Sequence, residues 1–246
     1  MFSKKIKFSA HEDYVYDKID EPVPIKLNIP EWFKKLQHSI QKPTVKGCMP
    51  FLDTLTSGYL LKVPQDFILQ HNVEQEGKIG SFFQPSLYAV SAIISAKHIN
   101  LNSMPEVHNS DQLKGSPLNE KNKHQGINKI LNPWTITTPP GYSCLFVPPL
   151  NNTDDRFSII PGIVDTDSFN KEINFPFIVN GDKYPHLDTI IKKGTPYVQV
   201  IPFKRDSWKM EISSTKQSVI QKRNIFYELT FIEKYKKKFW KKKTWN

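Results

Sequence analysis

The stretch from Asn132 to Trp208 decides the fold. It reads NPWTITTPPGYSCLFVPPLNN over residues 132–152, FSIIPGIVDTDSFNKEINFPFIV over 157–179, and IIKKGTPYVQVIPFKRDSW over 190–208. β-branched and aromatic residues cluster or alternate in each block, and Pro, Gly or Asn bound each block. Three such strand–turn–strand units in succession predict a twisted antiparallel sheet that closes toward a barrel or jelly roll.

The rest of the chain is organised around this core as one β-rich domain, residues 1–246. We expect an extended N-terminal arm with a short helix that begins at Pro30 (residues 1–43), followed by a β core over 44–212. Within the core, Tyr59 to Val63 and Phe67 to His71 have the pattern of a hairpin. Residues 100–128 are polar and rich in turn residues, which predicts a long internal loop.

The C-terminal segment 215–243 has apolar residues at helical spacing and predicts a long basic helix. Seven lysines and no acidic residue lie between Lys234 and Lys243, so this tail carries most of the net charge of +10. Such a tail fits three roles: a helix docked on its own domain with a solvated lysine face, contact with nucleic acid, or contact with an anionic membrane or acidic partner. The candidate contact residues are Lys236, Lys237, Lys238, Lys241, Lys242 and Lys243.

Composition excludes several classes. An apolar content of 38% indicates a folded chain. The sequence has no run of about 18 apolar residues, so no transmembrane segment is predicted. The N-terminus lacks the apolar region of a secretory signal. Cys48 and Cys144 are far apart in a chain without an export signal, which favours reduced thiols over a disulfide. We therefore expect a cytoplasmic location, in the producing or host cell.

Metal and cofactor motifs are missing from the sequence. His186-Leu187-Asp188 has the spelling of a metal pair, but no later histidine completes a three-ligand site. His108 with Asp111 is a similar fragment, and His108 is retained as a ligand-binding candidate. Phosphate-binding loops and nucleophile elbows are also lacking, so no metal and no cofactor are predicted.

Three segments of the opening stretch resemble, in order, motifs of the dUTPase and dCTP deaminase superfamily. Residues 138–152 (TPPGYSCLFVPPLNN) resemble the strand and turn that carry its phosphate-binding loop. Residues 162–167 (GIVDTD) are similar to its hairpin, whose first Asp positions the attacking water. Residues 194–201 (GTPYVQVI) are similar to a later motif that contains a glutamine. The resemblance implies a barrel of this superfamily and a trimeric assembly.

The departures from these motifs concern the residues that hold phosphate. Pro149-Leu150-Asn151 stands where the superfamily has Arg-Ser-Gly, and Pro196 stands where it has arginine. Triphosphate binding depends on charge-assisted hydrogen bonds from such groups. The resemblance therefore implies the fold and does not imply dUTP hydrolysis. The whole chain also resembles an uncharacterised family of bacterial and phage proteins, which brings no activity with it.

Four polar side chains in apolar segments are the remaining candidates in the core: Asp165 as a catalytic residue, and Asp167, Asn174 and Gln199 as ligand-binding residues. Asp165 and Asp167 equally suit capping of a tight hairpin. The leading hypothesis is a non-catalytic binding or structural protein on a dUTPase-like scaffold. The alternatives are a nucleotide or small-molecule hydrolase or deaminase in which Asp165 activates water, and nucleic-acid association through the lysine-rich tail. The hydrolase hypothesis predicts that Asp165, Asn174 and Gln199 surround one cavity.

Overall fold

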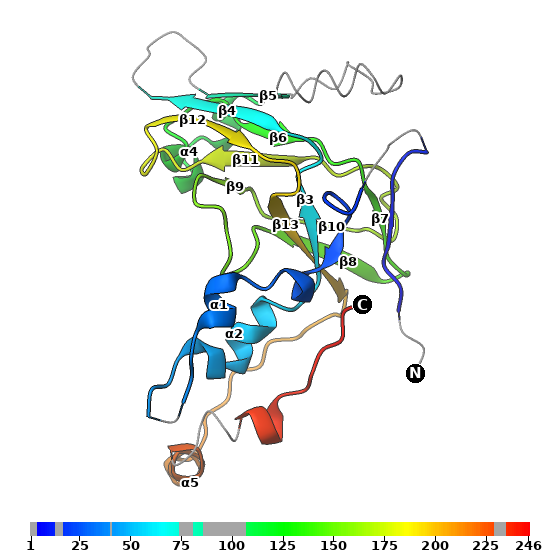
Figure 1. Cartoon of the computed structure of the whole chain (residues 1–246). Helices are drawn as coiled ribbons and strands as arrows, with labels where there is room; N and C mark the ends of the chain where they lie inside the picture. Colours follow the sequence, from blue (N-terminus) through cyan, green and yellow to red (C-terminus); the bar gives the residue numbers. More distant parts are fainter. Residues whose placement is uncertain (1–3, 13–16, 40, 74–80, 86–106, 229–234) are drawn as a thin grey trace. The chain divides into compact units, whose positions relative to one another are not determined.

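The computed structural model describes residues 4–12, 17–39, 41–73, 81–85, 107–228 and 235–246 (Figure 1). The described chain divides into two compact units where the sequence predicts one domain. Unit 1 comprises residues 1–23 and 58–204, and unit 2 comprises residues 24–57 and 205–246. No described helix has the length and apolarity that crossing a membrane requires.

Unit 1 is built from short strands, nearly all of which pair antiparallel. The strands are β1 (Lys7–Ser9), β2 (Val23–Pro24, which straddles the boundary to unit 2), β3 (Tyr59–Lys62), β4 (Phe67–Asn72), β5 (Ser81–Pro85), β6 (Asn128–Ile130), β7 (Thr135–Thr137), β8 (Tyr142–Val147), β9 (Phe157–Ile159), β10 (Gly162–Val164), β11 (Phe175–Val179), β12 (His186–Ile191) and β13 (Pro196–Lys204).

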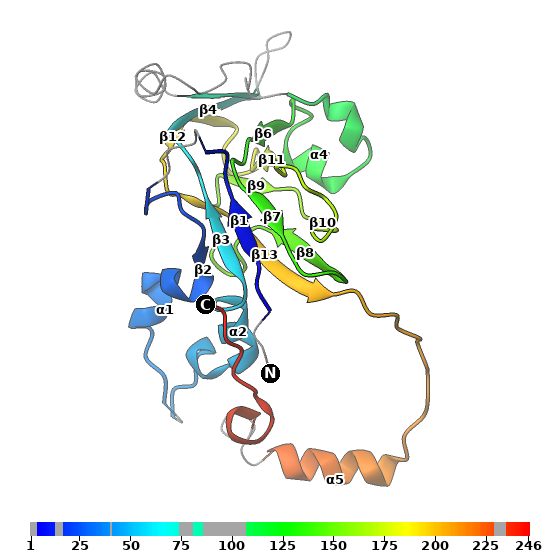
Figure 2. The ribbon, with the colours of Figure 1, turned by 90° about the vertical axis from the view of Figure 1, so that its right-hand side faces the viewer.

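These strands form four sheets, with the orders β1-β7, β10-β8-β13-β3-β2, β6-β11-β9 and β12-β4-β5. The mainly antiparallel β architecture that the sequence predicts is thus present (Figure 2). None of the four sheets closes into a barrel within the described residues. Turns rich in Pro and Gly interrupt the strands after two to nine residues, which divides the strands among several small sheets.

The core lies against one face of the five-stranded sheet. Cys144 and Phe146 of β8 and Val200 of β13 point into it, because alternate residues of a strand face the same side. Phe175 of β11 packs 5.3 Å, between ring centroids, from Phe146 and 5.7 Å from Tyr197. Aromatic residues of the stretch 132–208 therefore join β8, β11 and β13 into one interior.

The pairing of β3 and β4 differs from the sequence prediction. β3 and β4 lie at the predicted positions, but they do not form a hairpin: β3 pairs with β13, and β4 pairs with β12 and β5. Pro64, Gln65 and Asp66 turn the chain from one sheet into another.

The predicted polar loop 100–128 contains regular structure in its described part, residues 107–128. This part holds the 3-10 helix η3 (Ser110–Leu113) and helix α4 (Pro117–Lys121). Asn109 and Ser116 cap these helices, since their side chains accept hydrogen bonds from the backbone N–H groups of Asp111 and Leu118. Turn-forming residues thus start short helices here.

Unit 2 is mainly helical. It contains η1 (Ile25–Asn28), α1 (Glu31–Lys35), η2 (Val45–Gly47), α2 (Met49–Thr54), α5 (Gln217–Glu228) and a single π-helical turn, η4 (Tyr235–Phe239). The predicted short helix at Pro30 is confirmed as α1. The predicted continuous helix 215–243 is wrong for residues 240–243, which have no regular structure, and its residues 229–234 lie outside the described residues. Closely spaced lysines repel one another on a helix, which disfavours its continuation there.

Candidate functional site

Asp165 and Asp167 hold the turn after β10. The Asp165 carboxylate, at Oδ1, accepts a hydrogen bond of 2.6 Å from the Ser143 hydroxyl, and Asp167 Oδ2 accepts one of 2.8 Å from the backbone N–H of Gly141. Asp165 is exposed. Both carboxylates therefore join the turn to the start of β8, the capping role that Asp often has in tight turns.

Gln199 has a comparable role at the other end of β8. Its side chain is fully buried, and its Oε1 accepts a 2.9 Å hydrogen bond from the backbone N–H of Leu150. Gln199 pairs with Val147, whereas Asp165 bonds to Ser143. Four residues of an extended strand separate these two positions, which corresponds to about 13 Å.

Asn174 belongs to another sheet. It precedes Phe175, whose ring is in the core, so the Asn174 side chain points outward and is exposed. Its Oδ1 accepts a 3.2 Å hydrogen bond from the backbone N–H of Asn132. Asp165, Asn174 and Gln199 are thus each bonded to a different segment of the chain, and Gln199 is buried whereas Asp165 and Asn174 are exposed.

His108 lies in the segment before η3. Its backbone N–H and C=O both bond to Ile127, at 2.8 and 2.9 Å, in an isolated antiparallel bridge. Its imidazole is half-buried, and no group of His, Cys, Asp and Glu suited to a metal ion is found among the described residues. The backbone of His108 closes the loop from 108 to 127.

Cys144 does not have the environment of a nucleophile. The thiol is fully buried on β8 and accepts a hydrogen bond of 3.3 Å from the Thr166 hydroxyl. Burial raises the pKa of Cys144 to about 11, against a smaller lowering by Thr166. A thiol with this pKa stays protonated at neutral pH and is a poor nucleophile.

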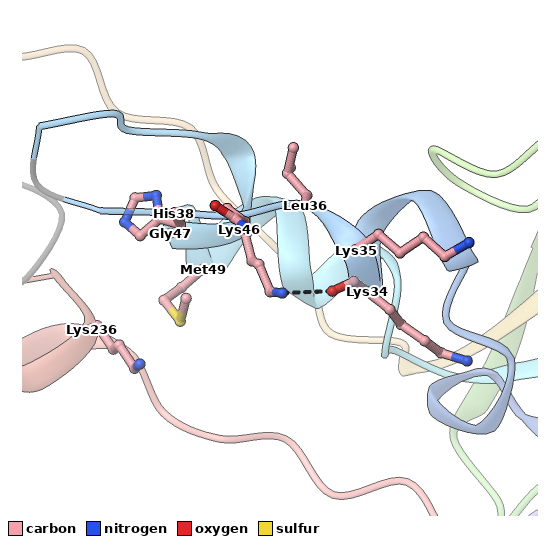
Figure 3. Close-up of a pocket in the computed structure, with 9 residues that line it drawn as sticks. Lys34, Lys35, Leu36, His38, Lys46, Gly47, Met49 and Lys236 are labelled. Atoms are coloured by element: carbon pink, nitrogen blue, oxygen red, sulfur yellow. Dashed lines mark hydrogen bonds between the residues drawn. The ribbon is translucent and has the colours of Figure 1, made fainter.

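A pocket of about 690 Å³ opens in unit 2 and is lined mainly by basic residues (Figure 3). This volume is within the usual range for small-molecule sites. Its lining contains four lysines, one histidine and no carboxylate: Lys34, Lys35, Leu36, Gln37, His38, Lys46, Gly47, Met49 and Lys236. We call it the lysine pocket.

Two local hydrogen bonds build the wall of the lysine pocket. Lys46, in η2, donates from Nζ to the backbone carbonyl of Lys34 near the end of α1, at 2.8 Å. This is the end of a helix that favours a cation. The backbone N–H of Thr44 donates to Nδ1 of His38 at 2.9 Å, so the neutral imidazole carries its hydrogen on Nε2.

Gly47 lies directly against the His38 ring. A Cβ atom added at Gly47 would be 2.3 Å from both Cε1 and Nε2 of His38. The absence of a side chain at residue 47 therefore lets the imidazole pack against η2.

The pocket's positive charge is only partly neutralised by its surroundings. Lys34 pairs with Glu31 at 2.6 Å, across exposed side chains. Lys35 and Lys236 are exposed, and neither has a carboxylate within ion-pair distance among the described residues. Uncompensated lysines on one wall attract anions, and each ammonium group supplies a point charge with three donors.

The charge of the whole chain is concentrated in unit 2. Unit 2 has 17 Lys and Arg residues against six Asp and Glu, a net charge of +11, while unit 1 has a net charge of −1. The sequence pattern assigns this excess of positive charge to the C-terminal tail alone. The lysines of α1 and η2 belong to the same basic unit.

The tail is fixed to α2 through Asp53. The Trp240 indole N–H donates to both carboxylate oxygens of Asp53, at 3.1 and 3.2 Å, and Lys243 forms an ion pair with the same group. Lys26 donates to the Asn246 side chain at 2.6 Å. The tail thus docks within its own unit, which is one of the three roles that the sequence allows.

The six predicted contact lysines therefore have different environments in the structure. Lys236 lines the pocket and Lys243 is bound to Asp53, whereas Lys237, Lys238, Lys241 and Lys242 are exposed. Sequence reasoning missed Lys34, Lys35, His38 and Lys46. The sequence feature that could have indicated this site is the pair of lysines directly after Trp32-Phe33, on the polar side of the predicted N-terminal helix.

The described structure is thus a mainly antiparallel β protein with a strongly basic second unit. No protein-family model and no curated protein sequence matches the chain. Among solved structures, a mutant dUTPase of Staphylococcus bacteriophage 80alpha, determined with dUpNHpp, matches 87% of this chain and 90% of its own at 9% sequence identity and a TM-score of 0.36.

Proposed function

We propose that this protein is a non-catalytic binding protein, and that its ligand is a phosphate-bearing polyanion, a nucleic-acid strand, held at the lysine pocket of unit 2. The observation that carries the proposal is a wall of four lysines and one histidine without a carboxylate. The β scaffold of unit 1 resembles the dUTPase superfamily in three sequence blocks.

The kind of residue in the pocket favours contact with the backbone of a nucleic acid. Lysines bind phosphates as point charges and release condensed counterions, which gives affinity that is independent of sequence. Base readout in the major groove uses the bidentate fork of arginine, and the pocket contains no arginine. We expect salt-dependent binding with little sequence preference.

The test is titration of a fluorescent single-stranded oligonucleotide with the full chain, followed by anisotropy at several salt concentrations. Reversal of one pocket lysine, in Lys35→Glu, Lys46→Glu or Lys236→Glu, should weaken binding about ten-fold at low salt and reduce the salt slope by about 1. Lys171→Glu is the matched control, because this exposed lysine of unit 1 gives the same change in net charge.

Equal losses of oligonucleotide affinity in Lys171→Glu and in the pocket variants would show attraction by net charge alone. This result would contradict a binding site at the lysine pocket. Absence of binding at low salt would overturn the choice of nucleic acid. The hydrolase alternative is checked on the same preparation: nucleotide turnover that Asp165→Asn abolishes would replace the non-catalytic proposal.

A further inference from the structure

Residues 205–213, directly after β13, expose three large apolar side chains in alternating positions. Trp208, Met210 and Ile212 are 90%, 82% and 86% exposed. The segment has no helix or strand and extends toward α5 (Figure 2). Side chains at every second residue share one face of an extended chain, so the segment presents an apolar face to solvent. We call residues 207–213 the arm.

The arm has the properties of a strand without a partner. Lys209 and Glu211 alternate with the three apolar residues, which is the pattern of a strand covered on one face. No hydrogen bond or ion pair of residues 208–212 is found among the described residues. Contiguous exposed apolar residues of this kind mark an interaction surface.

The sequence of the arm is complementary to itself in the antiparallel direction. When two copies are paired with Met210 opposite Met210, Lys209 lies opposite Glu211 of the second copy, and Glu211 lies opposite its Lys209. Trp208 then lies opposite Ile212, again twice. Opposite charges and aromatic–β-branched pairs are the combinations that stabilise antiparallel neighbours.

We propose that the arms of two copies of this chain pair antiparallel about a two-fold axis at Met210. The same patch then serves both copies, as in isologous dimers. The pairing uses the unpaired backbone groups of the arm as well as its apolar face. Because an isolated two-stranded ribbon is marginal in water, the association should depend on concentration.

Charge reversal tests this register. Lys209→Glu places Glu opposite Glu at both charged positions, and Glu211→Lys places Lys opposite Lys, so each variant should associate at least about ten-fold more weakly than the wild type in sedimentation velocity. The double variant Lys209→Glu/Glu211→Lys restores both pairs and should regain association. An equal mixture of the two single variants should form mixed dimers, since all four charged residues then face opposite charges.

A matched control makes the same charge changes away from the arm. Lys171→Glu and Glu172→Lys alter exposed residues of unit 1. These variants should behave as the wild type, alone and mixed. Association of the control mixture above the wild-type level would indicate general charge attraction and overturn the pairing.

A disulfide reports the two-fold position directly. In a Cys48→Ser background, Met210→Cys places two thiols opposite each other and should form a covalent dimer rapidly under mild oxidation. Ser213→Cys, which faces residue 207 of the second copy, should cross-link more slowly.

The proposal fails if the chain is monomeric at every concentration, if it forms a trimer that the charge variants leave unchanged, or if both cysteine variants cross-link at the same rate. Binding of anionic vesicles that Met210→Ser abolishes, without self-association, would assign the arm to a membrane instead. None of these measurements contains an oligonucleotide, so their outcome is independent of the proposed function.

Discussion

At the scale of single residues, His71 places an ionisable group in an apolar interior. It lies on the inward face of β4 with Phe67 and Leu69 and is 1% exposed. Neither ring nitrogen has a hydrogen-bond partner among the residues that the structure describes, and Nε2 lies close to Gly181, where an added Cβ would be 3.0 Å away. Burial lowers the pKa of His71 from its ordinary value of 6.5.

The lowered pKa of His71 predicts the direction of a pH effect. Below about pH 6.5 the unfolded chain takes up a proton at this residue more readily than the folded chain, so stability falls as pH falls. His71→Leu removes this contribution. Thermal unfolding between about pH 8 and about pH 5 should therefore show a smaller loss in His71→Leu than in the wild type. An identical pH dependence in both would contradict burial of a neutral imidazole.

Gly58 and Gly141 distinguish the conformational cost of replacing a glycine from the steric cost. Both have positive φ, +84° and +81°, but a Cβ at Gly58 would lie 2.1 Å from the carbonyl oxygen of Val200, while nothing lies within 4 Å at Gly141. Gly141→Ala should cost only the conformational term, about 1 kcal/mol. Gly58→Ala should cost a further ~1–3 kcal/mol, because the backbone of β13 must move. Chemical denaturation measures the free energy of unfolding of both variants. Equal losses of stability would argue against the close approach of β3 and β13.

At the scale of elements, sequence periodicity placed several strands and the short helix α1. β3, β4, α1 and β8 lie where alternating or apolar runs between Pro and Gly residues predict them. The pairing of these strands could not be predicted in the same way. Partners such as β3 and β13 are more than 130 residues apart, and pairing over such a separation depends on the shape of the whole core rather than on local pattern.

The C-terminal segment shows how tertiary contacts override local propensity. The spacing of Ile225, Leu229, Ile232, Tyr235 and Phe239 predicts one helix up to residue 243. Residues 229–234 lie outside the described residues, and the described helical structure of the tail ends with the π-helical turn at Phe239. The Asp53 carboxylate fixes Trp240 and Lys243 from a helix nearly 190 residues earlier. No local pattern in the tail indicates this anchor.

Removal of the anchor should release the tail. Asp53→Ala eliminates the acceptor of the Trp240 indole and the partner of Lys243. Limited trypsin digestion should then cut within the lysine run at least several-fold faster than in the wild type, since cleavage follows the population of the undocked state. Glu31→Ala is the control, because it removes an exposed carboxylate of unit 2 that pairs with Lys34. Equal cleavage rates in both variants would contradict docking through Asp53.

At the scale of the whole molecule, the charge is divided between the two units. The net charge of +11 in unit 2 and −1 in unit 1 gives the chain one basic region. Of the four lysines of the candidate site, the sequence indicated one, Lys236 in the tail. The other three lysines and His38 required the structure, because α1 and η2 are about 200 residues away from Lys236 in the sequence. Conversely, Asp165, Asn174 and Gln199 are close in sequence but have separate hydrogen-bond partners.

Lysine footprinting tests the central claim, that the ligand site is the lysine pocket of unit 2, most directly. Lysines are acetylated with and without a single-stranded oligonucleotide, and mass spectrometry compares the modification of each lysine in the full chain. We predict protection of Lys35, Lys46 and Lys236 in the presence of the oligonucleotide, and unchanged labelling of Lys171 in unit 1. Protection confined to unit 1, or labelling at the pocket lysines that the oligonucleotide does not change, would contradict the account.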